Sequence, residues 1–370
     1  MRDIAVGVSS VGDTLFTALR SENRIRSIAT AILLLNIAFA LTYDYIARLK
    51  AFDGLNGRWE LHADIVARQA EDPYRYRVLV PVGVEILQRL GLAENDGTGL
   101  DRLYGSYFLL ALFAILLATR WLLLTLGFDR GHALAGALLV GALLPISLRD
   151  HGFQPWSWLE AVSVLVAMVL TIQKPRPFVF AALIVVATFN RETAVFLPGL
   201  AIAAALVHRR EPTVRNRWLL TAVMGYIAWG GARALVYLIV GRADARAISV
   251  EEIFAMNTGP GGVQRSAEAL LLLLAGVALC AVLAAGARRL SPWMFWTAVI
   301  GVPQYIAGWL VFAVWWEVRV LVPALLLLVP AALAVLTRAS TREAEETGFR
   351  ASPEGPTVVI DRVRNQVPVV

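Results

Sequence analysis

Long apolar runs separated by short polar segments dominate this chain, and their lengths predict helices that cross a membrane. A helix that spans the hydrocarbon of a bilayer needs about 20 mainly apolar residues. The runs lie at 27–46, 103–126, 132–148, 156–172, 178–189, 194–207, 217–240, 268–285, 293–313 and 319–337. They predict an all-α, polytopic membrane protein with about ten transmembrane helices. The fifth and sixth runs are short for a crossing, and the polar residues 190–193 interrupt them.

The segment between the first two runs, residues 47–102, is long for a loop and has an apolar pattern of its own. Apolar residues spaced among charges over 56–71 predict a helix that lies on the outer surface. The stretch 78–90, VLVPVGVEILQRL, is too short to span and predicts a re-entrant or interfacial helix. We therefore expect a long first outer loop that carries surface helices.

The positive charges predict the orientation of the chain. Lysine and arginine gather in the N-terminal segment 1–26 and in the loops 173–177, 208–217 and 286–292. Cytoplasmic loops carry an excess of these residues, so we expect both termini in the cytoplasm and the protein in the plasma (inner) membrane. The expected units are a cytoplasmic segment 1–26, a transmembrane domain 27–337 and a disordered cytoplasmic tail 338–370.

Composition narrows the function classes. The chain is 58% hydrophobic with a mean hydropathy of +0.64, whereas soluble domains are roughly 45–50% apolar. Membrane orientation explains the net charge of +6 better than nucleic-acid binding does. The lone cysteine, Cys280, excludes an intrachain disulfide and a cysteine-based metal site. The sequence also lacks a phosphate-binding G-x-x-x-x-G-K-[ST] loop and a G-x-S-x-G nucleophile motif.

Four polar clusters lie beside or inside the apolar runs, all on the side expected to face outward. They are residues 72–77, 149–151, 190–193 and 315–319. A charge beside a spanning segment costs at least a few kcal/mol unless it is paired or faces water. Four such clusters in one chain predict a shared polar cavity at the outer face.

Two carboxylates near the outer end of the first run are candidate general bases. Asp44 lies at the end of this run, and Asp64 lies on the expected surface helix. Carboxylates are common bases in enzymes. The alternatives are a helix-end charge in an interfacial aromatic belt for Asp44 and a solvated helix face for Asp64.

The cluster Asp72-Pro73-Tyr74-Arg75-Tyr76-Arg77 alternates arginine with tyrosine. In an extended segment, Arg75 and Arg77 would project to one side and both rings to the other. Arginine binds phosphate oxygens in a bidentate way and keeps its charge. The cluster thus indicates phosphate binding with rings that stack on a sugar, or arginines that reach toward lipid headgroups.

In Asn190-Arg191-Glu192-Thr193, neighbouring helical residues do not face each other, so Arg191 and Glu192 would not neutralise each other well. Each charge should therefore find a partner elsewhere. The alternative is that Arg191 and Glu192 pair with each other and only neutralise the charge at the interruption between the two runs.

Two further clusters close apolar runs. In the first, Asp150 could orient His151 as a base or pair with Arg149 in a short turn. In the second, Glu317 could orient Arg319 for phosphate binding, or the segment could be an ordinary interfacial belt.

The segments 73–81, 190–193 and 317–319 are similar in sequence to segments of bacterial multi-span proteins that are placed near the C-type membrane glycosyltransferases. Over roughly residues 25–340 the chain resembles that superfamily, whose members use polyprenyl-phosphate-linked sugars. The shared features are a cytoplasmic N-terminus, a long first outer loop with carboxylates, broken spans and outer-face charges. Two features depart from it: the chain lacks an adjacent acidic pair after the first run and a large C-terminal outer domain.

The resemblance implies transfer of a sugar from a polyprenyl-phosphate donor to an acceptor hydroxyl at the outer face. It makes Asp64, Asp44 and Asp150 the candidate catalytic carboxylates. The implied substrate- and phosphate-binding residues are Asp72, Tyr74, Arg75, Arg77, His151, Asn190, Arg191, Glu192, Glu317 and Arg319. No cofactor is required, although carboxylate and phosphate oxygens would suit a divalent metal.

The rival function is a transporter or flippase for a lipid-linked or anionic solute. Such a protein would need polar groups in the cytoplasmic half as well, and Arg233 is the main candidate for one. A third alternative is a scaffold in which the clusters are structural ion pairs.

Overall fold

Every regular element in the described part of the chain is a helix. The computed structural model describes residues 24–51, 54–71, 73–147, 153–241, 251–252, 255, 277, 284–312 and 321–346. The elements are α2 (Arg24–Ala51), α3 (Gly54–Val66), η1 (Tyr74–Tyr76), α4 (Leu79–Arg89), α5 (Gly97–Thr125), α6 (Arg130–Ser147), α7 (Trp156–Ile172), α8 (Pro177–Asn190), η2 (Glu192–Phe196), α9 (Leu197–Val207), α10 (Pro212–Val240), η3 (Ala287–Arg289), α13 (Pro292–Phe312) and α14 (Val322–Glu346).

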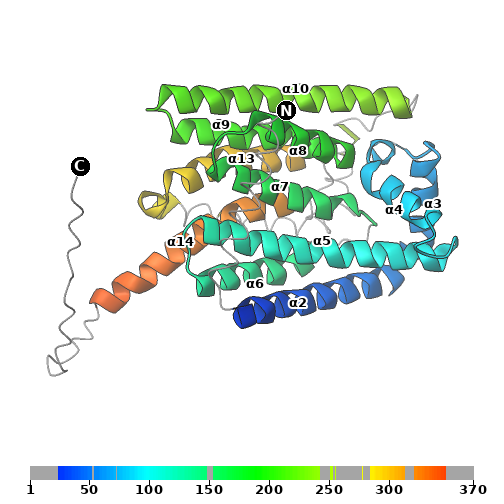
Figure 1. Ribbon diagram of the computed structural model, residues 1–370, viewed down its shortest axis with the longest axis horizontal. Helices are drawn as coiled ribbons and strands as arrows, with labels where there is room; N and C mark the ends of the chain where they lie inside the picture. Colours follow the sequence, from blue (N-terminus) through cyan, green and yellow to red (C-terminus); the bar gives the residue numbers. More distant parts are fainter. Residues whose placement is uncertain are drawn as a thin grey trace, which may run out of the picture.

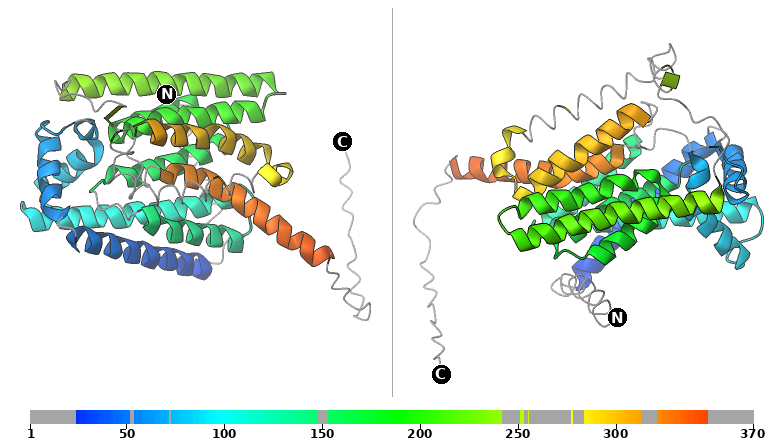
Figure 2. Two further views of the ribbon diagram at one scale, coloured as in Figure 1. Left: turned by 180° about the vertical axis from the view of Figure 1, so that it is seen from behind. Right: turned by 90° about the horizontal axis from the view of Figure 1, so that it is seen from above.

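The long helices form a bundle in which most run side by side (Figure 1). α5 packs against α2, α6 and α7, while α10 packs along both α8 and α9. α13 packs on α9 and on α14. The short helices α3 and α4 lie together at one end of the bundle, as Figures 1 and 2 show. We call α3, η1 and α4 the cap.

Among the residues that the structure describes, four helices are long and apolar enough to cross a membrane: 25–50, 97–125, 212–240 and 292–311. Their outward faces are apolar, with Ile28 on α2 and Leu238 on α10 both largely exposed. Large apolar side chains that face outward suit a lipid environment, because their exposure to hydrocarbon carries no free-energy penalty. The chain is therefore a helical protein with the character of a membrane protein.

The segment expected to be the first outer loop is mostly helical. The first helix runs on to Ala51, and α5 begins at Gly97 because the Asp96 carboxylate accepts a hydrogen bond from the Gly99 N–H at 2.8 Å. Between them, α3 and α4 occupy the two stretches predicted to be surface helices. The extended conformation considered for this cluster does not occur at Tyr74–Tyr76, which form a 3₁₀ turn.

The C-terminal helix also passes its expected end. α14 continues to Glu346, beyond residue 337. Most of the run expected at 268–285 lies outside the described residues.

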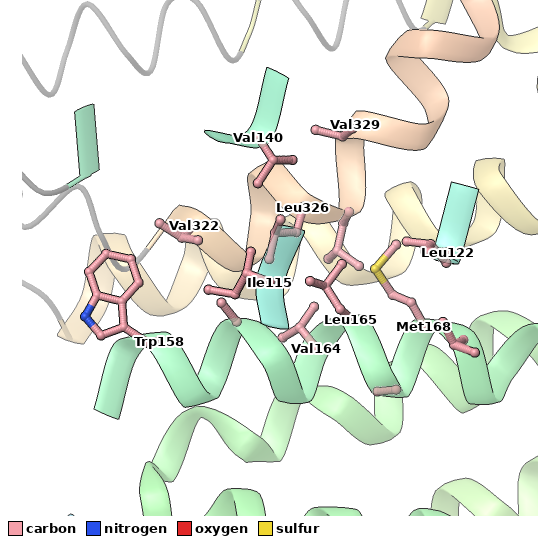
Figure 3. Packing of buried hydrophobic residues seen from close by; sticks show 14 of the residues in the cluster. Ile115, Leu122, Val140, Trp158, Val164, Leu165, Met168, Val322, Leu326 and Val329 are labelled. Carbon is pink, nitrogen blue, oxygen red and sulfur yellow. The ribbon is translucent and has the colours of Figure 1, made fainter. Parts of the chain in front are cut away.

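The bundle is held together by a continuous apolar core. Figure 3 shows Ile115 of α5, Val164 and Leu165 of α7 and Leu326 of α14 meeting in its centre. All four side chains are almost fully buried. The helix α7 is therefore enclosed by its neighbours, and any polar side chain on it must find a partner inside the protein.

The chain breaks between α8 and α9. Arg191 has extended backbone angles, and Pro198 follows at the start of α9. With 14 and 11 residues, the two helices are about 21 and 16 Å long at 1.5 Å per residue. Both are shorter than the roughly 30 Å hydrocarbon layer. Residues 190–196 therefore form a polar turn inside the bundle, close to the cap.

Candidate functional site

Arg77 joins the cap to the turn between α8 and α9. Its Nη2 donates a hydrogen bond to Glu192 Oε1 at 2.6 Å, and its Nε lies 3.4 Å from Oε2. The Arg77 side chain is 7% exposed, whereas the Glu192 side chain is 30% exposed. The Trp229 indole also donates to the backbone oxygen of Glu192 at 3.1 Å. Glu192 is thus fixed from two sides and still reaches the surface.

Arg191 points the other way, into α7. Its Nη1 donates to Glu160 Oε2 at 2.6 Å and lies 3.3 Å from the Ser157 hydroxyl. The second oxygen of Glu160 accepts a hydrogen bond from the Thr193 hydroxyl. The ion pair is buried on both sides, with the Arg191 and Glu160 side chains 5% and 8% exposed. Such a pair is stable only when hydrogen bonds satisfy both partners.

The expectation that Arg191 and Glu192 find separate partners is confirmed. Arg191 pairs with Glu160 on α7, and Glu192 pairs with Arg77 on the cap. Glu160 was not among the predicted site residues, although it is the one carboxylate in the apolar run 156–172. That isolation was the available signal, because a carboxylate enclosed by apolar residues needs a cationic partner.

Asn190 closes the turn on the other side. Its side-chain amide donates to the Trp156 backbone oxygen at 2.8 Å. The three residues 190–192 therefore bind three different partners: the start of α7, the interior of α7 and the cap. The turn is held by side chains where helical hydrogen bonds are absent.

Aromatic rings surround Arg77. Its guanidinium carbon lies 5.4 Å from the Tyr74 ring centre and 5.1 Å from that of Trp156. The two rings lie 5.6 Å apart. The expectation that the rings lie on the side away from the arginines fails for Tyr74, whose ring lies against Arg77 together with that of Trp156.

Arg233 has a second aromatic environment. Its guanidinium carbon lies 4.6 Å from the Tyr76 ring centre and 4.7 Å from that of Tyr237. Arg233 is the 22nd residue of α10, about 32 Å from its start at 1.5 Å per residue. The expectation that Arg233 lies in the half of the bundle away from the other clusters is wrong, since it touches the cap.

The described residues leave little free space beside the turn. A cavity of about 10 Å³ is lined by Glu160, Ser163, Val164, Ala187, Arg191, Ala194, Leu197 and Tyr305. That is room for about one water molecule. Within the described part of the chain, the buried Tyr305 hydroxyl has no hydrogen-bond partner. A water in this cavity would satisfy it.

A third polar group ties the cap to α5. His62 Nδ1 lies 2.9 Å from the Tyr104 hydroxyl, and Nε2 lies 3.3 Å from Glu85 Oε2. Burial lowers the pKa of His62, although Glu85 acts in the opposite direction. A hydrogen bond from Arg89 lowers the pKa of Glu85. The imidazole is therefore held neutral between the helices near pH 7.

The two carboxylates expected to be bases lie apart from these contacts. Asp44 pairs with Arg48 on its own helix at 2.9 Å and is 42% exposed. Asp64 is exposed on α3, where its backbone oxygen accepts from the N–H groups of residues 69 and 70. Within the described residues, the Asp64 carboxylate makes no hydrogen bond or ion pair.

Five of the predicted site residues lie outside the described residues: Asp72, Asp150, His151, Glu317 and Arg319. Arg149, the neighbour of Asp150, also lies outside them. Among the residues that are described, no group of three or more histidine, cysteine or acidic side chains could hold a metal. Comparison with protein-family models, curated proteins and solved structures finds no match for this chain.

Proposed function

We propose that the protein transfers a sugar from a polyprenyl-phosphate donor to an acceptor hydroxyl at the outer face of the membrane. The observation that carries the proposal is the ion pair between Arg77 and Glu192. The pair joins an arginine, a residue type suited to binding phosphate, to a partly exposed carboxylate at a polar break among apolar helices. A glycosyl transfer that releases a lipid phosphate needs these two groups side by side.

In this mechanism Glu192 is the base, in place of Asp64 or Asp44. The donor phosphate competes with Glu192 for Arg77, and the released carboxylate becomes a better proton acceptor. Glu192 then takes the proton of the acceptor hydroxyl, and the oxygen of that hydroxyl attacks the anomeric carbon of the sugar. The bond from that carbon to the phosphate oxygen breaks, and polyprenyl phosphate leaves with its charge on Arg77.

The orientation belongs to the same proposal. Ten spans in a plasma membrane, with both termini in the cytoplasm, put the cap and the turn 190–196 toward the outside. The arginine- and lysine-containing loops 173–177 and 208–217 then face the cytoplasm. The lipid-linked donor would reach the site from the outer leaflet.

Proteoliposomes supply the test. Purified protein is mixed with a polyprenyl-phosphate sugar carrying a radiolabelled hexose, and transfer to an acceptor fraction from the cell envelope is measured. We expect transfer by the wild type and a loss of at least about a hundredfold in Glu192→Gln, as for a removed general base. Asp44→Asn is the matched control and should retain transfer, because among the described residues that carboxylate pairs with Arg48 of its own helix.

Absence of any covalent product with the wild type, across several hexose donors, would refute the proposal. Movement of labelled donor across the bilayer without a covalent product would instead favour a transporter. Arg233, the residue that could have extended a polar path into the other half, touches Tyr76 of the cap. The described residues therefore give the transporter no support of their own.

A further inference from the structure

Tyr305 of α13 carries a buried hydroxyl beside the ion pair between Arg191 and Glu160. The residue is 3% exposed, and its hydroxyl has no hydrogen-bond partner among the described residues. The hydroxyl lies within electrostatic reach of both Glu160 and Arg191. The ring packs edge-on against Phe196, with 5.0 Å between the ring centres. This contact holds the ring in place, so the hydroxyl needs a partner inside the bundle.

The cavity bounded by α7, α8, α9 and α13 has room for that partner. Tyr305, Glu160 and Ser163 all line it, and its volume is about 10 Å³. That volume is about the smallest that holds one water molecule. A phosphate, a sugar or any other larger ligand is therefore excluded.

Polar groups around the cavity match the hydrogen bonds of a water molecule. A carboxylate has about four acceptor positions, and the hydrogen bonds to Glu160 from Arg191 and Thr193 use two of them. The Ser163 hydroxyl donates to the backbone of its own helix at 2.8 Å, and its oxygen can still accept. With the Tyr305 hydroxyl, these groups give a water the two to four partners that a buried water has.

The charges beside the cavity disfavour an ion. Arg191 and Glu160 lie 2.6 Å apart with side chains 5% and 8% exposed, and their charges cancel. A cation would face the guanidinium group, and an anion would face the carboxylate. Either ion would leave a net charge buried among apolar helices, which is strongly unfavourable. A neutral molecule that both donates and accepts hydrogen bonds suits the site, and water is such a molecule of the right size.

We propose that this cavity binds one water molecule, which joins the Tyr305 hydroxyl on α13 to the Glu160 carboxylate on α7. The same carboxylate holds Arg191 and Thr193 of the polar turn. The water therefore links α13 to the side chains that fix the break between α8 and α9. The inference does not depend on the proposed function, because sugar transfer plays no part in it.

The sign of one stability change separates a bonded hydroxyl from an unbonded one. Tyr305→Phe removes the hydroxyl alone, and thermal unfolding of the purified full-length protein is followed in detergent. A hydroxyl bonded through water stabilises the fold, so we expect the Tm to fall by about 2–4 °C. An unbonded buried hydroxyl destabilises the fold, so a Tm that stays level or rises would overturn the proposal. Tyr226→Phe, on α10 and 40% exposed, is the matched control and should change the Tm by less than about 1 °C.

Radiolytic labelling of the wild type identifies the partner and needs no variant that folds. X-ray pulses split bound water, and the hydroxyl radicals formed there oxidise the adjacent side chain, which mass spectrometry quantifies. Tyr104 is the matched reference, because it is also buried and its hydroxyl contacts His62. We expect Tyr305 to be oxidised at least about fivefold faster than Tyr104, since a bound water lies beside its hydroxyl. Equally slow oxidation of the two tyrosines would overturn the proposal, even with a lowered Tm in Tyr305→Phe, because the hydroxyl would then be bonded to the protein.

A change of salt tests for an ion in the same cavity. The Tm of the wild type is compared in sodium, potassium and choline chloride at equal ionic strength. We expect the same Tm in all three salts, because a water site has no preference among these cations. A rise in Tm that is specific to sodium or potassium and disappears in Tyr305→Phe would show that the site binds a cation, and it would overturn the assignment of water.

Discussion

Arg77 Nη2 lies 2.6 Å from Glu192 Oε1, although 115 residues separate the two in sequence. The bond connects the end of η1 with the turn that separates α8 from α9. Both segments are too short and too polar to be stable alone in a membrane. Each therefore supplies the charge that the other needs, and the cap is fixed over the polar turn.

Breaking this pair should destabilise the protein. Removing one partner of a buried ion pair costs about 3–5 kcal/mol, and partial exposure of Glu192 reduces that cost. We expect Arg77→Gln to lower the free energy of unfolding by about 2–3 kcal/mol. Equilibrium unfolding in mixed micelles measures it. The double variant Arg77→Gln with Glu192→Gln should lose less than the two single losses added together. Strict additivity would show that the pair has no coupling energy.

Loss of Glu160 should be more damaging than loss of Glu192. Glu160→Ala leaves the buried Arg191 guanidinium without its carboxylate, and we expect a loss of about 3–5 kcal/mol. The same unfolding assay measures it. Glu94→Ala removes an exposed pair with Arg102 and should cost less than about 1 kcal/mol. Similar losses in the two variants would contradict the buried position of Glu160.

Stability should depend on pH through His62. Its pKa is lower in the folded protein than in the unfolded chain, so folding favours the neutral imidazole. The stabilisation is complete above about pH 6.5 and is lost as the pH falls through the lower, folded value. We expect the Tm of the wild type to fall over this interval and that of His62→Gln to stay nearly level. His208→Gln, in the loop after α9, is the control and should follow the wild type.

The pH effects of His62 and Glu85 fall in different pH ranges. The pKa of Glu85 is also lowered, so its stabilisation is present above about pH 4.3 and is lost only below that value. The His62→Gln variant should therefore still lose stability in strong acid. A wild-type Tm that stays constant between pH 5 and 7 would contradict the buried, neutral imidazole.

Much of the helical framework follows from the apolar runs, because the length and hydropathy of a run decide whether it forms a buried helix. α5, α7 and α10 lie close to their expected positions. The short lengths of α8 and α9 and the separate partners of Arg191 and Glu192 could also be predicted. Those predictions depend only on local spacing and on the cost of an unpaired charge.

The rest of the site depends on which helices become neighbours, and spacing along the chain does not encode that. Nothing near Glu160 in sequence indicates that Arg191 is its partner. The alternation of Tyr74 to Arg77 suits an extended strand equally well, whereas the folded chain forms a 3₁₀ turn with Tyr74 against Trp156. Proximity in sequence favoured Asp64, whereas the fold brings Glu192 to the arginines instead.

Sided labelling should show that the cap and the loop after α9 lie on opposite sides of the membrane. Cys280 is the one cysteine of the chain, so Cys280→Ser provides a background without thiols. Glu94→Cys lies just before the start of α5, beside the cap, and His208→Cys lies just after the end of α9. The start of α5 and the end of α9 are at opposite ends of the bundle (Figure 1). An impermeant maleimide added to intact cells should label the first and spare the second, and permeabilised cells should show both labelled. Reversal of the pattern would place the cap and Glu192 in the cytoplasm, where a donor in the outer leaflet could not reach them. Labelling of both sites in intact cells would mean that the cells leak, so a cytoplasmic marker enzyme must stay inside in the same experiment.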